Sequence, residues 1–187
     1  MKSLKTIATV FVTLTIVVGT ACADRHAKAP DLAADIVHAL NQAGLTDVSV
    51  SQDRDKGVVS LTGNVASYDD RTRAESIAQS IAGKEVVSNQ IGIRPNGDES
   101  TAKKVDSDLD SGIDKNLDAM LLQYRLKRDV KYDVTNGVVT LKGDVASQAQ
   151  RASVEKLAGQ VPNVRQVVNE IEVKHQRATS TKATSTK

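Results

Sequence analysis

Few side chains in this 187-residue sequence have the types and spacing that catalysis or metal binding requires. The three histidines, His26, His38 and His175, lie far apart, and none sits in a ligand-like cluster with Cys or Asp. The segment DSDLDSG, residues 106–112, only faintly resembles a calcium loop, because Asp118 stands where such a loop has glutamate and glycine does not follow the third acid directly. Acids near the start of a helix explain this segment better. We therefore predict no enzyme activity, no catalytic residues, no metal and no cofactor.

A second candidate for chemistry is the basic, aromatic stretch YRLKRDVKY, from Tyr124 to Tyr132. Its basic residues are Arg125, Lys127, Arg128 and Lys131. Each basic side chain near an anionic membrane contributes about 1 kcal/mol of attraction, and tyrosine suits the boundary between water and lipid. The stretch predicts a phospholipid-binding site made of Tyr124 and the four basic residues. The alternative is that both tyrosines belong to the core and a sheet edge, and that the charges form a solvated face.

The chain begins with the layout of a secretory signal peptide, which we predict to be residues 1–23. Two lysines precede an apolar run, residues 7–18, that is too short to span a membrane, and small residues follow in GTACAD. Two outcomes are open. Cleavage after Ala23 would release a periplasmic chain, whereas lipidation of Cys22 would give a lipoprotein. Cys22 is the only cysteine, so we expect no disulfide framework, and the mature chain has no second long apolar run.

The charge balance and the aromatic content argue against nucleic acid as a partner. Without the two leader lysines the formal net charge of +2 falls to zero. The chain has no tryptophan, and its one phenylalanine lies in the predicted leader. A general nucleic-acid-binding protein instead carries a basic face interleaved with aromatic residues.

The clearest feature of the sequence is an internal repeat. GVVSLTGNVAS at residues 57–67 and GVVTLKGDVAS at residues 137–147 lie 80 positions apart and agree at 8 of 11 positions. The offset continues without a gap over about 37 positions, which indicates a duplicated structural unit. Polar pairs that recur with it are Arg71 and Arg151, Glu75 and Glu155, and Asn89 and Asn169.

Hydrophobic periodicity predicts the order helix, strand, strand, helix, strand in each copy. The predicted fold class is α+β: two tandem small α/β sandwich domains, each with a three-stranded mixed sheet and two helices on one face. The predicted segments are a signal peptide (1–23), an N-terminal linker (24–30), domain 1 (31–94), a polar, turn-rich linker (95–108), domain 2 (109–173) and a disordered basic tail (174–187).

Four repeated glycines are predicted to be structural: Gly57, Gly63, Gly137 and Gly143. Because side chains alternate along a strand, Gly63 and Gly143 should face inward with the valines and leucine around them. We expect either a helix that crosses the sheet closely there or a bulge leading into the second helix. Asn89 and Asn169 should also face inward, and we expect them to hold the turn before the last strand, because buried asparagines need partners. A ligand contact is the alternative at both pairs.

Each copy spans only about 65 residues, a size at which a domain is marginally stable. Two helices on one face of a sheet would leave the other face exposed. We therefore expect the two copies to pack on each other or on a partner.

A signal-bearing chain with two such units resembles the BON-domain family, which includes OsmY-like bacterial envelope proteins. The likeness is carried by GVVSLTGNV with VVSNQIGI, and by GVVTLKGDV with QVVNEIEV. The resemblance implies an envelope protein of osmotic or envelope stress that binds phospholipid surfaces. In family members that bind lipid the first helix of the second unit is implicated, which corresponds to residues 109–128 here. The motif is a fold signature, so it transfers no binding residues one by one.

Two functions from different classes follow. The first is a non-catalytic cell-envelope protein that associates with anionic phospholipid through the second domain, in envelope or osmotic stress maintenance. The second is a periplasmic protein-interaction or chaperone-like module that uses an exposed sheet face or edge to bind an envelope protein. The basic cluster favours the first.

Overall fold

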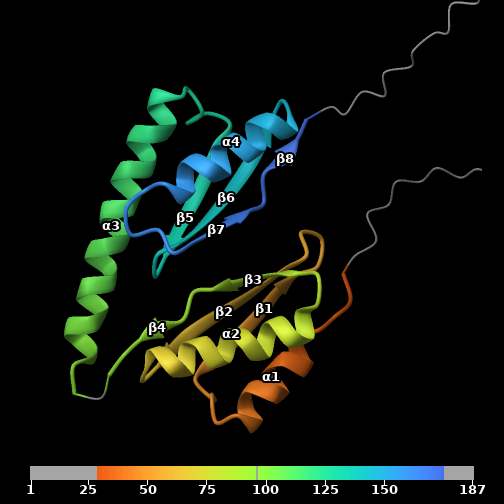
Figure 1. Ribbon diagram of the computed structural model, residues 1–187, viewed down its shortest axis with the longest axis vertical. Helices are drawn as coiled ribbons and strands as arrows, with labels where there is room; N and C mark the ends of the chain where they lie inside the picture. The colour runs from red at the N-terminus through yellow and green to blue at the C-terminus, as the bar shows by residue number, and fades with distance from the viewer. Residues whose placement is uncertain (1–28, 96, 175–187) are drawn as a thin grey trace, which may run out of the picture.

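The computed structural model describes residues 29–95 and 97–174, which form two units with the same order of elements (Figure 1). The first unit consists of α1 (Ala33–Gln42), β1 (Val48–Asp53), β2 (Val58–Val65), α2 (Tyr68–Ala82), β3 (Val86–Asn89) and β4 (Gly92–Ile93). The second consists of α3 (Glu99–Gln123), β5 (Val130–Thr135), β6 (Val138–Val145), α4 (Gln148–Gly159), β7 (Gln166–Asn169) and β8 (Glu172–Val173). The predicted α+β class with two tandem small α/β domains is confirmed. The predicted signal peptide, Cys22 and the tail after Lys174 lie outside the described residues.

Each sheet is three strands wide and mixed. In the first unit β2 is the middle strand, antiparallel to β1 and parallel to β3 and β4. Val58 lies opposite Val86 and Val65 lies opposite Ile93, so the register is the same on both sides of the break between β3 and β4. β3 and β4 are therefore two pieces of one interrupted third strand. The second unit repeats this pattern with β5, β6, β7 and β8.

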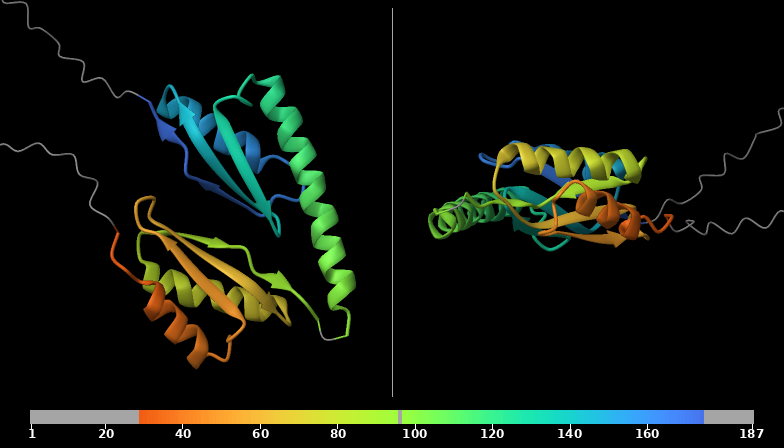
Figure 2. Two further views of the ribbon diagram at one scale, coloured as in Figure 1. Left: turned by 180° about the vertical axis from the view of Figure 1, so that it is seen from behind. Right: turned by 90° about the horizontal axis from the view of Figure 1, so that it is seen from below.

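Both helices of each unit share one core with a single face of the sheet (Figures 1 and 2). The first core includes Ile36 and Leu40 of α1, Ala74 and Ala78 of α2, and Val59, Leu61 and Val65 of β2. The second includes Ile113, Leu117 and Leu121 of α3, Val154 and Ala158 of α4, and Val139, Leu141 and Val145 of β6. Alternation along β2 and β6 turns every second side chain toward the helices, as the period of two requires.

The repeated strand glycines are needed where a neighbouring strand begins. Gly63 has φ +110° and Gly143 has φ +118°, a region that favours glycine. A Cβ atom on Gly63 would lie 2.0 Å from the carbonyl oxygen of Asp47, and one on Gly143 would lie 2.1 Å from that of Asp129. Both contacts are with backbone just before the adjacent strand. The expected close approach is present, but it comes from the backbone of the neighbouring strand rather than from a crossing helix. The expected bulge is absent up to these glycines, because the pairing register runs unbroken to Val48 opposite Gly63 and Val130 opposite Gly143.

The segment between the domains is mostly helical rather than turn-rich. α3 begins at Glu99 and continues for 25 residues into the core helix of the second domain. The first half of α3 is stabilised by contacts with residues outside the helix. Arg94 forms an ion pair with Asp106 at 2.5 Å, and the Asp110 carboxylate accepts hydrogen bonds from the backbone N–H groups of Asn136 and Gly137, both at 2.8 Å. This segment has few apolar residues to bury, so these tertiary contacts are what stabilise it as a helix. α3 consequently runs alongside both domains (Figure 1).

The two domains meet along their edge strands β3 and β7, at one corner of the sheet faces that carry no helix. Val58 of β2, Val138 of β6 and Val168 of β7 form a small buried cluster that contains residues of both domains. β3 and β7 lie side by side there. The Gln166 side chain forms hydrogen bonds with backbone groups at the edge of β3, in place of a neighbouring strand. Its amide nitrogen donates to the Val87 carbonyl at 2.7 Å, and its oxygen accepts from the Asn89 N–H at 3.1 Å. The two copies therefore pack on each other, as their small size predicts.

The glycine geometry makes a stability prediction. Gly143→Ala should lower the free energy of unfolding by about 2–3 kcal/mol, because alanine must adopt the left-handed region and the β5–β6 backbones must separate. Gly112→Ala is the control, since nothing lies within 4 Å of a Cβ atom there, and it should raise stability by about 0.5–1 kcal/mol as an ordinary helix substitution. Urea unfolding followed by circular dichroism measures both. Equal effects of the two substitutions would contradict the backbone contact.

Candidate functional site

The described part of the chain offers a surface rather than a metal centre as its candidate site. Within residues 29–95 and 97–174, no three histidine, cysteine or acidic side chains gather as metal ligands would. In the same range no helix has the length and hydrophobicity to cross a bilayer. The predicted lipid-binding residues lie where α3 ends and the chain turns into β5.

The turn after α3 is shaped by two buried anchors. Tyr124 ends the helix, and Arg125 takes a left-handed conformation with φ +59° that reverses the chain. The Leu126 N–H then donates to the Leu121 carbonyl at 2.8 Å, and the Leu126 side chain enters the core. Val130, where β5 starts, is also buried. With Leu126 and Val130 turned inward, the residues between and around them project into solvent.

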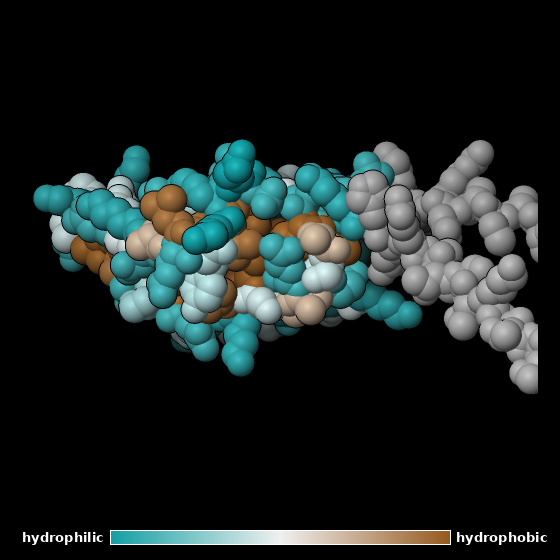
Figure 3. Space-filling view, turned by 90° about the horizontal axis from the view of Figure 1, so that it is seen from above, coloured by the Kyte–Doolittle hydropathy of each residue, from teal (hydrophilic) through white to brown (hydrophobic). Residues whose placement is uncertain are grey.

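Five of these outward residues form what we call the end patch: Leu122, Tyr124, Arg125, Arg128 and Lys131. Leu122 is 63% exposed and Tyr124 is 50% exposed, which are high fractions for large apolar side chains. Figure 3 views the molecule from the end where α3 finishes and shows hydrophobic surface interleaved with hydrophilic surface. Among the described residues, no carboxylate forms an ion pair with any of the three basic members. The end patch therefore combines exposed apolar groups with three basic groups, and the exposed Asp129 lies in the same segment.

Lys127 and Tyr132 belong to a different arrangement, which fastens α3 to β5. Lys127 forms an ion pair with Asp118 and lies 5.7 Å from the centre of the Tyr132 ring. The Tyr132 hydroxyl is 2.5 Å from Asp118 Oδ1 and 3.1 Å from the Asp114 carbonyl oxygen. The sequence placed Lys127 with the other basic residues. The structure instead pairs its charge with an acid of the preceding helix.

The surroundings of Tyr132 shift its ionisation. Burial, together with the charge and the side chain of the nearby Asp114, raises the pKa of Tyr132 from 10.0 to about 12. A neutral phenol is thus favoured in the folded protein. The predicted alternative, in which this tyrosine is structural, describes Tyr132, while Tyr124 remains at the surface.

The repeated polar residues form one cluster in each domain. Asn89 accepts a hydrogen bond from the Ile91 N–H at 3.3 Å and donates to Glu75 at 2.9 Å, and Arg71 donates to the Asn89 carbonyl at 3.2 Å. These bonds hold the break between β3 and β4 against α2. The asparagine is structural, as expected, but it secures a break within the last strand rather than the turn before it. The recurrence of all three residues was visible in the sequence, but their mutual contact was not.

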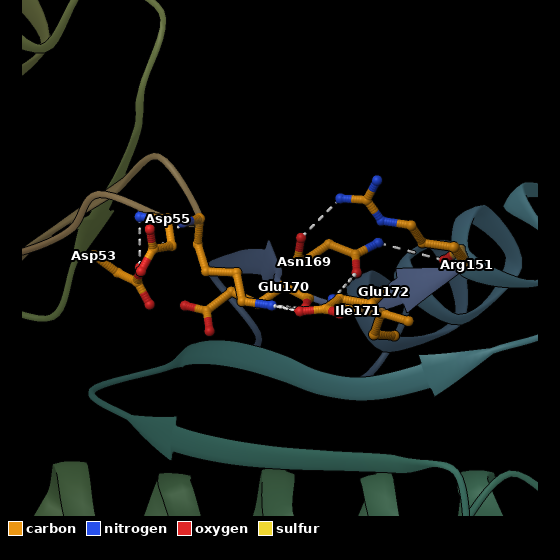
Figure 4. Close-up of polar contacts among 8 residues, drawn as sticks. Asp53, Asp55, Arg151, Asn169, Glu170, Ile171 and Glu172 are labelled. Carbon is orange, nitrogen blue, oxygen red and sulfur yellow. Dashed lines mark hydrogen bonds and ion pairs between the residues drawn. The ribbon is translucent and has the colours of Figure 1, made fainter. Parts of the chain in front are cut away.

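The second domain repeats this cluster with Arg151, Glu155 and Asn169. Figure 4 shows the contacts between Arg151, Asn169 and Ile171. Beside it lies an inter-domain contact from the β1–β2 hairpin, which is two residues longer than its counterpart in the second domain. Lys56 Nζ, in that hairpin, forms an ion pair with Glu172 and lies 3.5 Å from the Glu170 carbonyl oxygen. The two extra residues thus help the first domain to reach the second.

Comparison with known proteins gives a family match over most of the chain. The family model for the BON domain matches residues 28–95 and 103–175. The protein described as "Osmotically-inducible protein Y" of Escherichia coli (strain K12) is 32% identical over 129 residues, which are 69% of this chain and 63% of that relative. The chain thus spans less than two thirds of the length of that relative. "Uncharacterized protein in gshII 5'region" of Anaplasma centrale is 35% identical over 125 residues, 65% of this chain and 80% of the relative.

Solved structures resemble the chain only distantly. The C-terminal domain of CdsD, described as the structural protein of the type III secretion system of Chlamydia trachomatis, aligns over 78% of this chain and 98% of its own length. The TM-score is 0.32 and the sequence identity is 15%. A likeness of this size carries no argument about fold or function.

The environment of Tyr132 makes a prediction about pH. Because its folded pKa of about 12 lies above the unfolded value of 10.0, Tyr132 adds stability below pH 10 that is lost as the pH rises toward 12. Titration followed by tyrosinate absorbance should show one tyrosine ionising near pH 12. Tyr132→Phe should remove this step, and Tyr124→Phe is the control that should keep it. Persistence of the step in Tyr132→Phe would contradict the assignment.

Proposed function

The chain belongs to the BON-domain family, and we propose that it is a non-catalytic cell-envelope protein that binds anionic phospholipid surfaces through the end patch of its second domain. The description of the Escherichia coli relative as osmotically inducible supports a role in osmotic or envelope stress. The predicted signal peptide supports export to the periplasm, and Cys22 offers a lipid anchor there. The end patch is the observation that carries the proposal.

The electrostatic part of the proposal rests on three side chains. Arg125, Arg128 and Lys131 are exposed on one short segment, and the proposal requires that they approach an anionic surface together. Each would gain about 1 kcal/mol near an anionic leaflet, an attraction that salt weakens because it acts within a Debye length. Lys127 is left out, since its charge is already paired with Asp118.

The apolar part rests on Leu122 and Tyr124. An exposed leucine next to an exposed tyrosine, rimmed by basic residues, is the composition of a shallow membrane contact. Attraction by the basic residues would bring these two side chains to the headgroup level, where burying them adds affinity that salt does not remove.

The first domain lacks this combination. The corresponding helix α1 ends at Gln42, and the turn that follows is Ala43-Gly44-Leu45-Thr46, which carries no charge. Leu45 is buried in the first core, as Leu126 is in the second. The turn after α1 thus buries a leucine as the turn after α3 does, but it lacks the basic residues. We therefore assign membrane binding to the second domain.

The alternative, a protein-interaction or chaperone-like module, loses part of the surface that it needs. It relied on an exposed sheet face or edge, and the contact of β3 with β7 and the Val58, Val138 and Val168 cluster cover part of that surface, while the outward residues of β1 and β5 stay exposed. Capture of an unfolded chain therefore becomes an outcome of the test below.

Co-sedimentation with vesicles tests the proposal. The protein, residues 24–187, should sediment with vesicles of anionic phospholipid at low salt and sediment less at high salt. With zwitterionic vesicles it should stay in the supernatant. The triple variant Arg125→Glu, Arg128→Glu, Lys131→Glu should lose this binding at least tenfold, because three attractions of about 1 kcal/mol become repulsions.

The matched control reverses three other exposed lysines on α3, Lys103, Lys104 and Lys115, and so makes the same change in net charge away from the end patch. It should bind nearly as well as the unaltered protein, as should a variant lacking the basic tail after Lys174. Equal losses in both triple variants would show that binding depends only on net charge and would overturn the end patch. Absence of binding to anionic vesicles at low salt, together with capture of an unfolded chain, would favour the protein-interaction alternative.

A further inference from the structure

A cavity of about 410 Å³ lies at the junction of the two domains, away from the end patch. It opens between the first two turns of α2 and the segment that leads into β7. Its walls include Tyr68, Arg71, Thr72, Glu75, Arg165 and Gln166. Two of these residues are arginines from different domains.

Arg71 is a buried cation with an unused donor. The residue is 7% exposed, and its guanidinium donates through Nη2 to the Asn89 carbonyl, while its buried Nε has no hydrogen-bond partner among the described residues. Burying a charged group without pairing it is costly, as is leaving a buried donor unsatisfied. No described carboxylate forms an ion pair with Arg71.

The one carboxylate in the cavity wall is already engaged. Glu75 accepts from the Asn89 side chain at 2.9 Å with one oxygen and from the Gln79 side chain at 3.1 Å with the other. It therefore offsets the charge of Arg71 only partly.

Arg165 adds a second positive charge to the same cavity. Its Nη2 donates to the Asn136 carbonyl of the β5–β6 hairpin, which holds the guanidinium in place. Burial, and then the repulsion of Arg165, lower the pKa of Arg71. Two cations that face one cavity across a domain boundary would both be stabilised by an anion between them.

The second domain provides an internal comparison. Arg151 repeats the geometry of Arg71: it donates to the Asn169 carbonyl at 3.0 Å, and its buried Nε also lacks a partner among the described residues. The cavity beside Arg151, however, is lined by Asp55, Glu170 and Glu172 and by Lys56, which pairs with Glu172 (Figure 4). Three acids against two cations make it less favourable for an anion than the cavity of the first domain, where two arginines face one glutamate.

We propose that the cavity between α2 and β7 binds a phosphate group, held by Arg71 and Arg165 with the Tyr68 hydroxyl beside it. A phosphate monoester suits this site better than a carboxylate, because it carries close to two negative charges and three acceptor oxygens that donors from several sides can share. The volume leaves room for a small group attached to the phosphate. The occupant would contact both domains, and its binding does not depend on the function proposed for the end patch.

Nuclear magnetic resonance of arginine side chains tests the site directly. In residues 24–187, inorganic phosphate and glycerol 3-phosphate should shift the Nε–Hε signals of Arg71 and Arg165 and leave that of Arg151 in place. Acetate at the same concentration should shift them less. Arg165→Gln, a substitution of an exposed side chain, should weaken phosphate binding in calorimetry by about tenfold, the loss expected for one charge-assisted contact.

Two controls keep the test decisive. Arg128→Gln removes the same charge from the end patch and should leave phosphate binding unchanged, even though it affects vesicle binding. Phosphate should raise the thermal unfolding temperature of the unaltered protein but not that of Arg165→Gln, because a ligand stabilises only the state that binds it. Unmoved Nε–Hε signals, or equal phosphate affinity in Arg165→Gln and the unaltered protein, would overturn the proposal.

A second experiment distinguishes a lipid headgroup from a dissolved phosphate ester as the source of the phosphate. If the site takes a lipid, vesicles that contain phosphatidic acid should recruit more protein than phosphatidylglycerol vesicles of equal charge, and Arg165→Gln should abolish the difference. If the site takes a dissolved ligand, glycerol 3-phosphate should bind and the two kinds of vesicle should recruit equally.

Discussion

The contact between the two domains along β3 and β7 is the constraint on which the rest of the molecule depends. Each domain alone is close to the size at which its hydrophobic core gives only marginal stability. Each also has one sheet face without helices. Burial of Val58, Val138 and Val168 between these faces removes apolar surface from water, and Gln166 supplies the hydrogen bonds of a missing strand. Two marginal units are thereby joined into one body.

That junction also determines where chemistry can occur. It brings Arg165 to the same cavity as Arg71, whose charge Glu75 offsets only partly. It also fixes α3, whose first half is tied to the first domain by Asp106 and to the β5–β6 hairpin by Asp110. The far end of α3 then carries the end patch, through which we propose that the protein meets a membrane surface.

Local patterns in the sequence were sufficient for the fold. The repeat and the alternation of apolar residues predicted the order of elements, since both depend on neighbours in the chain. Features that depend on distant residues were missed: the contact that requires Gly63, the helical first half of α3, and the pairing of Lys127 with Asp118. The end patch was predicted only in part, because exposure of Leu122 follows from how α3 packs. The cavity between Arg71 and Arg165 was not predictable, because it exists only once the domains pack.

The central claim, that the two domains form one body, is tested most directly by backbone N–H residual dipolar couplings in a weakly aligned solution. Couplings from residues 29–95 and from residues 97–174 should each fit the structure and should give the same alignment tensor in magnitude and direction. Tensors that differ between the two domains would show independent reorientation, and would contradict both the inter-domain packing and the cavity that it creates.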